Sequence, residues 1–180
     1  MQQAAEYYLQ IKAANPNATI VLTGHSLGGG LAALIGVFFG VRATTFDQAP
    51  FANTAKQGLL GTASYALDLK IYLIGKGYSD AALADLTSFL QVQQNIRGIP
   101  NSDLVTNISV QGEFLSTAPL TLFDRIGTTV KEISNSSNGV SGFDLHSQSL
   151  LTAFLQSEKT AVSGKALNDV RIYETERRVA

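Results

Sequence analysis

The residues best suited to covalent chemistry lie early in the chain, in Gly24-His25-Ser26-Leu27-Gly28. This Gly-x-Ser-x-Gly pattern follows an apolar run and leads into a helical segment rich in glycine and alanine. A serine in that setting sits on a tight strand-to-helix turn, with its hydroxyl exposed above the sheet. We expect Gly24 and Gly28 to be required, because a side chain at either position would strike the neighbouring strand or helix. The pattern predicts that Ser26 is a nucleophile.

A nucleophilic serine needs a histidine base, and the chain contains only two histidines. His25 adjoins the serine within the turn, so we expect its side chain to point away from the serine's face and to pack and hydrogen-bond locally. His146 lies far downstream in Phe143-Asp144-Leu145-His146-Ser147. This position suits a chain order of serine, acid, histidine. His146 is therefore the candidate base.

The base in turn needs a carboxylate to orient its ring, and several acidic residues compete for that role. Glu113 follows the strand-like segment ending at Val110 and is the first candidate, with Asp124 and Asp47 as alternatives. Asp103 precedes that strand, and Asp144 is too close to the histidine in sequence. Each candidate can also be an ordinary exposed charge or a helix cap.

The same chemistry needs hydrogen-bond donors for a negatively charged oxygen that forms during acyl transfer. The backbone N–H of Leu27, directly after the nucleophile, is one candidate, and a loop on an earlier strand would supply the second. No metal or other cofactor is expected. The chain has no cysteine, which excludes a thiolate metal site and a cysteine nucleophile.

These side chains must be positioned by elements whose patterns are readable. Ala18 to Thr23 and Val41 to Phe46 are predicted strands on either side of a buried helix, Leu27 to Phe39. Such a unit predicts an α/β fold with a mainly parallel sheet and helices on both faces. The remaining expected elements are a helix over Gln2 to Ala14, a strand over Leu104 to Gln111, a last strand or hairpin arm over Thr128 to Ile133, and a helix over Leu145 to Gln156.

Residues 54–100 differ in pattern from the strand-helix-strand unit before them. They predict two helices, the second beginning at Ser79 and Asp80. This insertion is either a packed helical layer or a cap that closes over the active site. Both interpretations remain open at this stage.

Composition sets broad limits on class. With 180 residues, 45% hydrophobic, 15% charged and a net charge of −1, the chain is expected to form one soluble domain, residues 1–180. That charge balance does not favour a nucleic-acid partner. No signal peptide is visible at the N-terminus, and the longest apolar stretch, Leu31 to Val41, is too short to cross a bilayer.

Several segments resemble the fungal-type, or class 3, lipase family and its bacterial relatives. Thr23 to Ala32 resembles the family's nucleophile turn, and Thr45 to Pro50 is similar to its Phe-Gly-x-Pro segment. Val110 to Leu115 is similar to the stretch that bears the family's catalytic aspartate, with Glu113 in place of Asp. Leu145 to Ser147 resembles the histidine segment. Together these matches cover about residues 18–150.

The resemblance implies a partial α/β-hydrolase fold and a serine hydrolase of carboxylic esters. The implied activity is that of a lipase or phospholipase in lipid metabolism, acting through an acyl-enzyme at Ser26 on triacylglycerol or phospholipid. Acyl transfer to an acceptor other than water would use the same residues.

The family places several strands and the second oxyanion loop before the nucleophile strand, whereas this chain has room there for one helix. We therefore expect an N-terminally truncated chain whose sheet has an open edge, available for self-association or for a partner chain. The alternative function is a non-catalytic, truncated hydrolase fold that serves binding or assembly.

Overall fold

The computed structural model describes residues 1–56, 64–95, 98–116, 123–127, 129–133, 141–148 and 151–152. Its elements, in chain order, are α1 (Gln2–Ala14), β1 (Leu22–His25), α2 (Ser26–Phe39), β2 (Ala43–Phe46), α3 (Ala52–Ala55), α4 (Tyr65–Gly75), α5 (Ala84–Gln93), the 3₁₀ turn η1 (Ser102–Leu104), β3 (Val105–Val110), the 3₁₀ turn η2 (Phe114–Ser116), β4 (Thr129–Ile133) and α6 (Gly142–Leu145). The expected α/β class is confirmed.

The four described strands form one sheet in the order β1-β2-β3-β4, and every pairing is parallel. The register places His25 beside Phe46 and Phe46 beside Ile108. The carboxyl ends of the strands therefore meet at one edge of the sheet, where open parallel sheets carry their sites. β4 is parallel to β3, so it is a sheet strand and not the arm of a hairpin.

The central helix α2 crosses the sheet and carries most of the core. It packs on β1, β2 and β3, and every residue from Ala32 to Phe39 is buried. Its aromatic side chains contact two other helices: Phe38 meets Phe89 of α5 at 4.9 Å between ring centroids, and Phe39 meets Tyr8 of α1 at 5.0 Å. Gly40 ends the helix in the left-handed conformation, as expected of a C-terminal glycine.

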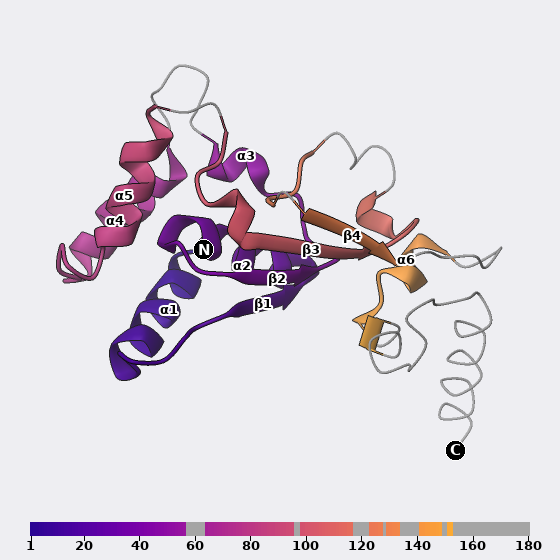
Figure 1. The fold of residues 1–180 in the computed structure, drawn as a ribbon, viewed down its shortest axis with the longest axis horizontal. Helices are drawn as coiled ribbons and strands as arrows, with labels where there is room; N and C mark the ends of the chain where they lie inside the picture. The colour runs from indigo at the N-terminus through magenta and orange to yellow at the C-terminus, as the bar shows by residue number, and fades with distance from the viewer. Residues whose placement is uncertain are drawn as a thin grey trace.

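The two helices of the 54–100 insertion belong to this core. α5 packs on α2 and α4, and α4 packs on α1. Leu69, Leu73, Leu86 and Phe89 are fully buried in the same cluster as α2. Figure 1 shows α4 and α5 at the left, near the start of β3, while α6 lies at the right, where the strands end. A cap role for residues 54–100 stays a prediction.

Several predicted boundaries shift. The first strand begins at Leu22, later than Ala18, and α5 begins at Ala84, after a turn over residues 80–83. Ser79 still caps that turn, since its Oγ accepts a hydrogen bond from the Ala82 N–H at 3.3 Å. Most of the helix predicted over Leu145 to Gln156 lies outside the described residues.

Candidate active site

The turn that carries Ser26 is strained and tightly packed. Ser26 has φ 54°, in the left-handed region that side chains other than glycine seldom adopt. It joins β1 directly to α2, so its side chain stands at the carboxyl edge of the sheet. No side chain caps the first turn of α2. The Leu27 N–H lies in that turn, at the positive end of the helix dipole, where an oxyanion would be stabilised.

The glycines of this turn do not contribute equally. A Cβ at Gly24 would lie 2.3 Å from the Gly28 carbonyl oxygen, and one at Gly29 would lie 2.9 Å from the Gly24 carbonyl oxygen. A Cβ at Gly28 would meet no heavy atom within 4 Å. The expected collision at Gly24 is therefore present, whereas the one expected at Gly28 was wrong. The close crossing of strand and helix depends on Gly24 and Gly29.

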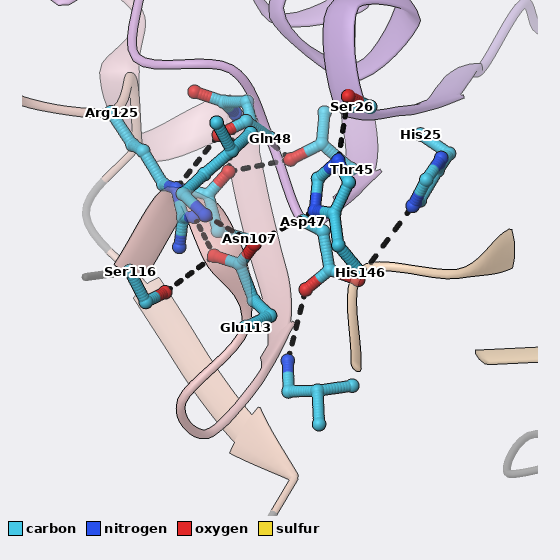
Figure 2. A network of polar contacts seen from close by, with 12 residues as sticks. His25, Ser26, Thr45, Asp47, Gln48, Asn107, Glu113, Ser116, Arg125 and His146 are labelled. Carbon is cyan, nitrogen blue, oxygen red and sulfur yellow. Dashed lines mark hydrogen bonds and ion pairs between the residues drawn. The ribbon is translucent and has the colours of Figure 1, made fainter. Parts of the chain in front are cut away.

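The helix α6, a single turn at the carboxyl edge of the sheet, positions His146 next to Ser26. Ser141 caps this turn, because its Oγ accepts a hydrogen bond from the Asp144 N–H at 3.2 Å. The His146 Nε2 lies 2.8 Å from Ser26 Oγ, and the Nδ1 lies 2.7 Å from Glu113 Oε2 (Figure 2). The Ser26 hydroxyl, the His146 imidazole and the Glu113 carboxylate thus form one continuous chain of hydrogen bonds. The three residues lie far apart in the amino-acid sequence.

Glu113 follows β3 after a turn in which Gly112 has φ 81°. Its side chain is fully buried, which by itself raises the carboxyl pKa. Hydrogen bonds outweigh that effect: besides His146, the Ser116 hydroxyl donates at 2.5 Å, the Leu115 N–H at 2.7 Å and the Arg125 guanidinium at 2.5 Å. The net result is a pKa of about 2. Glu113 is therefore a stable carboxylate at the pH where a histidine can act as a base.

The two alternative acids lie elsewhere. Asp124 is exposed and pairs with Lys56 at 2.9 Å. Asp47 is buried at the end of β2, where its Oδ1 accepts a hydrogen bond from the Val110 N–H at 3.0 Å. Its Oδ2 lies 3.7 Å from His25 Nε2, and neither atom has a hydrogen bond. Asp47 lies near His146, but of the three candidate acids Glu113 is the one whose carboxylate is within hydrogen-bond distance of the His146 ring.

The side chain of His25 was expected to point away from the site, but it does not. Its ring lies beside the ring of His146, with centroids 4.9 Å apart. Burial is the main cause that lowers the pKa of His25, and His146 adds to the effect. Burial likewise raises the pKa of Asp47 to about 6. The His25 ring and the Asp47 carboxyl thus both lie next to His146, in surroundings that disfavour their charged forms.

Among the described residues, one group of side chains has the types that bind metal ions. Ligand atoms of His25, Asp47 and His146 all lie within 4.8 Å of one another. Both ring nitrogens of His146 already contact Ser26 and Glu113. The donor set thus matches a proton-transfer chain better than a metal centre.

Sequence reasoning missed Arg125. It lies in a segment with no regular pattern, yet its guanidinium contacts the buried Glu113 and its Nε donates to the Gln48 carbonyl at 2.8 Å (Figure 2). Its only available signal was the rarity of basic residues between Gly98 and Glu132, where Arg125 and Lys131 are the two.

Comparison with known proteins assigns the chain to a family through the part that ends just after β3. A model of the family described as "Lipase (class 3)" matches residues 2–112, more than half of the chain. The match ends one residue before Glu113, so it includes the nucleophile turn and β3 but not His146.

Relatives with lipase names match shorter segments. "Putative lipase ATG15" of Eremothecium gossypii is 48% identical over 58 residues, 32% of this chain and 10% of that protein. The protein of the same name in Penicillium rubens is 38% identical over 63 residues, 34% and 9%. In Cryptococcus neoformans var. neoformans the identity is 61% over 33 residues, 18% and 6%. The matched segments thus span a tenth or less of these relatives. On the family match and the fold, this chain belongs to the class 3 lipase family of ester hydrolases.

Proposed function

We propose that the chain is a serine hydrolase of carboxylic esters that acts through an acyl-enzyme at Ser26. The observation that carries this proposal is the uninterrupted sequence of contacts from Ser26 through His146 to the buried Glu113, at 2.8 and 2.7 Å. Serine is a weak nucleophile until a base removes its proton, and these contacts supply both the base and the group that orients it.

The proposed reaction has two halves. Ser26 Oγ attacks the acyl carbonyl carbon while His146 Nε2 takes the hydroxyl proton, and the Leu27 N–H donates to the developing oxyanion. The C–O bond to the alcohol then breaks, and His146 returns the proton to the leaving oxygen. Water attacks the resulting ester of Ser26 by the same route and releases the carboxylic acid. Glu113 stays ionised throughout and stabilises the imidazolium.

The proposed substrates are lipid esters, either triacylglycerol or phospholipid. Support comes from the family and from relatives whose names contain lipase.

None of the helices in the described part of the chain is long and apolar enough to cross a membrane.

Hydrolysis of p-nitrophenyl esters of graded acyl length tests this function. Ser26→Ala is expected to abolish turnover, and Glu113→Gln to lower kcat by about 10³- to 10⁴-fold, as loss of the orienting carboxylate does elsewhere. Asp124→Asn is the matched control, because this exposed carboxylate lies outside the contact chain. Folded wild-type protein without activity on any chain length would instead favour the non-catalytic alternative.

We propose further that the free edge of the sheet pairs with a second polypeptide. β1 has a neighbour on one side only among the described strands. Beside it lies a cavity of about 500 Å³, lined mainly by apolar side chains of α1, β1 and α2. Val21, next to the edge, is 59% exposed. Sedimentation of wild type and Val21→Lys tests the idea: a charge there should weaken any self-association, and identical monomeric behaviour of both proteins would exclude pairing between copies.

A further inference from the structure

Glu113, the acid of the proposed triad, has several hydrogen-bond partners besides His146. His146 and the Leu115 N–H contact Glu113 Oε2, while the Ser116 hydroxyl and the Arg125 guanidinium contact Oε1. A glutamate has one more rotatable bond than an aspartate, so its carboxylate needs more contacts to stay in one orientation. The contacts on Oε1 determine which oxygen is left to face the imidazole.

Arg125 is itself held by a buried frame of amides (Figure 2). Its Nε donates to the Gln48 carbonyl, at the carboxyl end of β2. The Gln48 side chain pairs with the backbone of Ile126, accepting from its N–H at 2.8 Å and donating to its carbonyl at 3.2 Å. Asn107 donates to the same carbonyl at 2.7 Å. Gln48 and Asn107 are each 1% exposed, so this frame is part of the protein's interior.

We propose that Arg125 is a positioning residue of the active site, which fixes the Glu113 carboxylate so that Oε2 accepts the His146 Nδ1–H. This inference rests on the proposed hydrolase function. The guanidinium contacts two acceptors, the Gln48 carbonyl and Glu113 Oε1, through separate nitrogens. A lysine has one nitrogen and no rigid fork, so it can supply the charge but not this geometry.

Charge and geometry can therefore be separated by two variants. Arg125→Lys keeps the charge and loses the fork, whereas Arg125→Gln loses both. We measure the rate at which a fluorophosphonate labels the protein: the Ser26 Oγ–P bond forms, fluoride leaves, and the hydroxyl proton passes to His146. We expect the rate to fall about tenfold in the lysine variant and about 100-fold in the glutamine variant, since small misplacements of catalytic groups have effects of that order.

Partial recovery in the lysine variant supplies a readout that a purely structural role would not move. Both variants are compared at equal concentrations of folded protein, so the difference in labelling rate between them reports the charge and the fork and not the stability of the fold. Lys56→Gln is the matched control: it removes a positive charge that pairs with Asp124, next to Arg125 in the chain, without contacting Glu113.

A second measurement does not depend on activity. The Nδ1 proton of His146 should give a downfield NMR signal, assigned by its loss in His146→Gln, and this signal should weaken or shift in both Arg125 variants. Unchanged labelling rates and an unchanged signal in both variants would overturn the inference. Wild-type protein that fails to label at Ser26 contradicts the proposed hydrolase function instead, and the NMR signal then still decides whether Arg125 positions Glu113.

Discussion

At the scale of single residues, the site contains two buried carboxyl groups whose pKa values are shifted in opposite directions. Glu113 accepts hydrogen bonds at both oxygens, and its pKa is about 2. Asp47 has one hydrogen bond for two oxygens, and its pKa is about 6. Neither side chain is exposed to solvent, so the number of hydrogen-bond donors decides the direction in which each carboxyl pKa shifts.

The raised pKa of Asp47 has a consequence for stability. In the unfolded chain this carboxyl ionises near its ordinary value of 3.8, so between pH 4 and 6 the folded protein binds more protons. Stability therefore falls as the pH rises through that window, by about 3 kcal/mol at most from a shift of roughly two units. For Glu113 the sign is reversed: its stabilisation is present above the ordinary pKa of 4.5 and is lost as the pH falls toward 2.

We accordingly predict that Asp47→Asn stabilises the protein at pH 8 and leaves its stability nearly unchanged at pH 4. The amide oxygen can still accept from the Val110 N–H, while the cost of a buried charge is removed. Urea unfolding at the two pH values measures the difference, with the exposed Asp124→Asn as the control. A variant less stable than wild type at pH 8 would show that the Asp47 carboxylate makes a favourable contact in the folded state.

At the scale of elements, the close crossing of β1 and α2 holds Ser26 in place. The two elements meet without a connecting loop, and the helix begins at the serine itself. The Ala49 N–H also donates to the Ser26 carbonyl at 3.0 Å, which fixes the turn to the segment after β2. The left-handed backbone of Ser26 is therefore held from two sides.

The two glycines that flank the serine provide a test within one motif. Gly24→Ala should destabilise the protein by about 3 kcal/mol or more, because its Cβ would lie 2.3 Å from a backbone oxygen. Gly28→Ala should be neutral or stabilise by about 0.5–1 kcal/mol, since alanine suits a helix better and meets no atom within 4 Å. Thermal unfolding compares them. Equal losses at both positions would mean that the motif's glycines serve something other than this crossing.

How far the sequence predicts this site depends on the kind of contact. Ser26 and its turn follow from a local pattern, His146 from the shortage of histidines, and Glu113 from its place after a strand. The contact of Arg125 with Glu113, and the ring of His25 beside His146, depend on how separate elements pack. Contacts between residues of separate elements leave no periodic pattern in the sequence, so the structure was needed to find them. The free space around Gly28, where a Cβ would meet no atom within 4 Å, likewise depends on how the strand and the helix cross.

At the scale of the whole molecule, the core and the site occupy different regions. The helices α4 and α5 contribute their buried side chains to the cluster built on α2. The helix α6, which directly precedes His146, lies away from them, where the strands end (Figure 1). The helices of the 54–100 insertion thus stabilise α2, whose first residue is Ser26.

Truncation of this layer should cost stability. Phe89 of α5 is 1% exposed and packs edge-on against Phe38. We predict that Phe89→Ala lowers the free energy of unfolding by about 3–5 kcal/mol, as for other buried aromatic side chains. Val92→Ala, on the exposed side of the same helix (46% exposed), is the control and should change it by less than about 1 kcal/mol. A small effect at Phe89 would mean that α5 is loosely attached and free to move as a cap.

The central claim is that Ser26 and His146, 120 positions apart, share a proton. The most direct measurement is mass-spectrometric mapping of a fluorophosphonate adduct on wild type, Ser26→Ala and His146→Gln. We predict one adduct on the peptide containing Ser26, none in the alanine variant, and labelling slowed at least about 10³-fold in the glutamine variant. Wild-type labelling elsewhere, or an equal rate without the imidazole, would contradict the account.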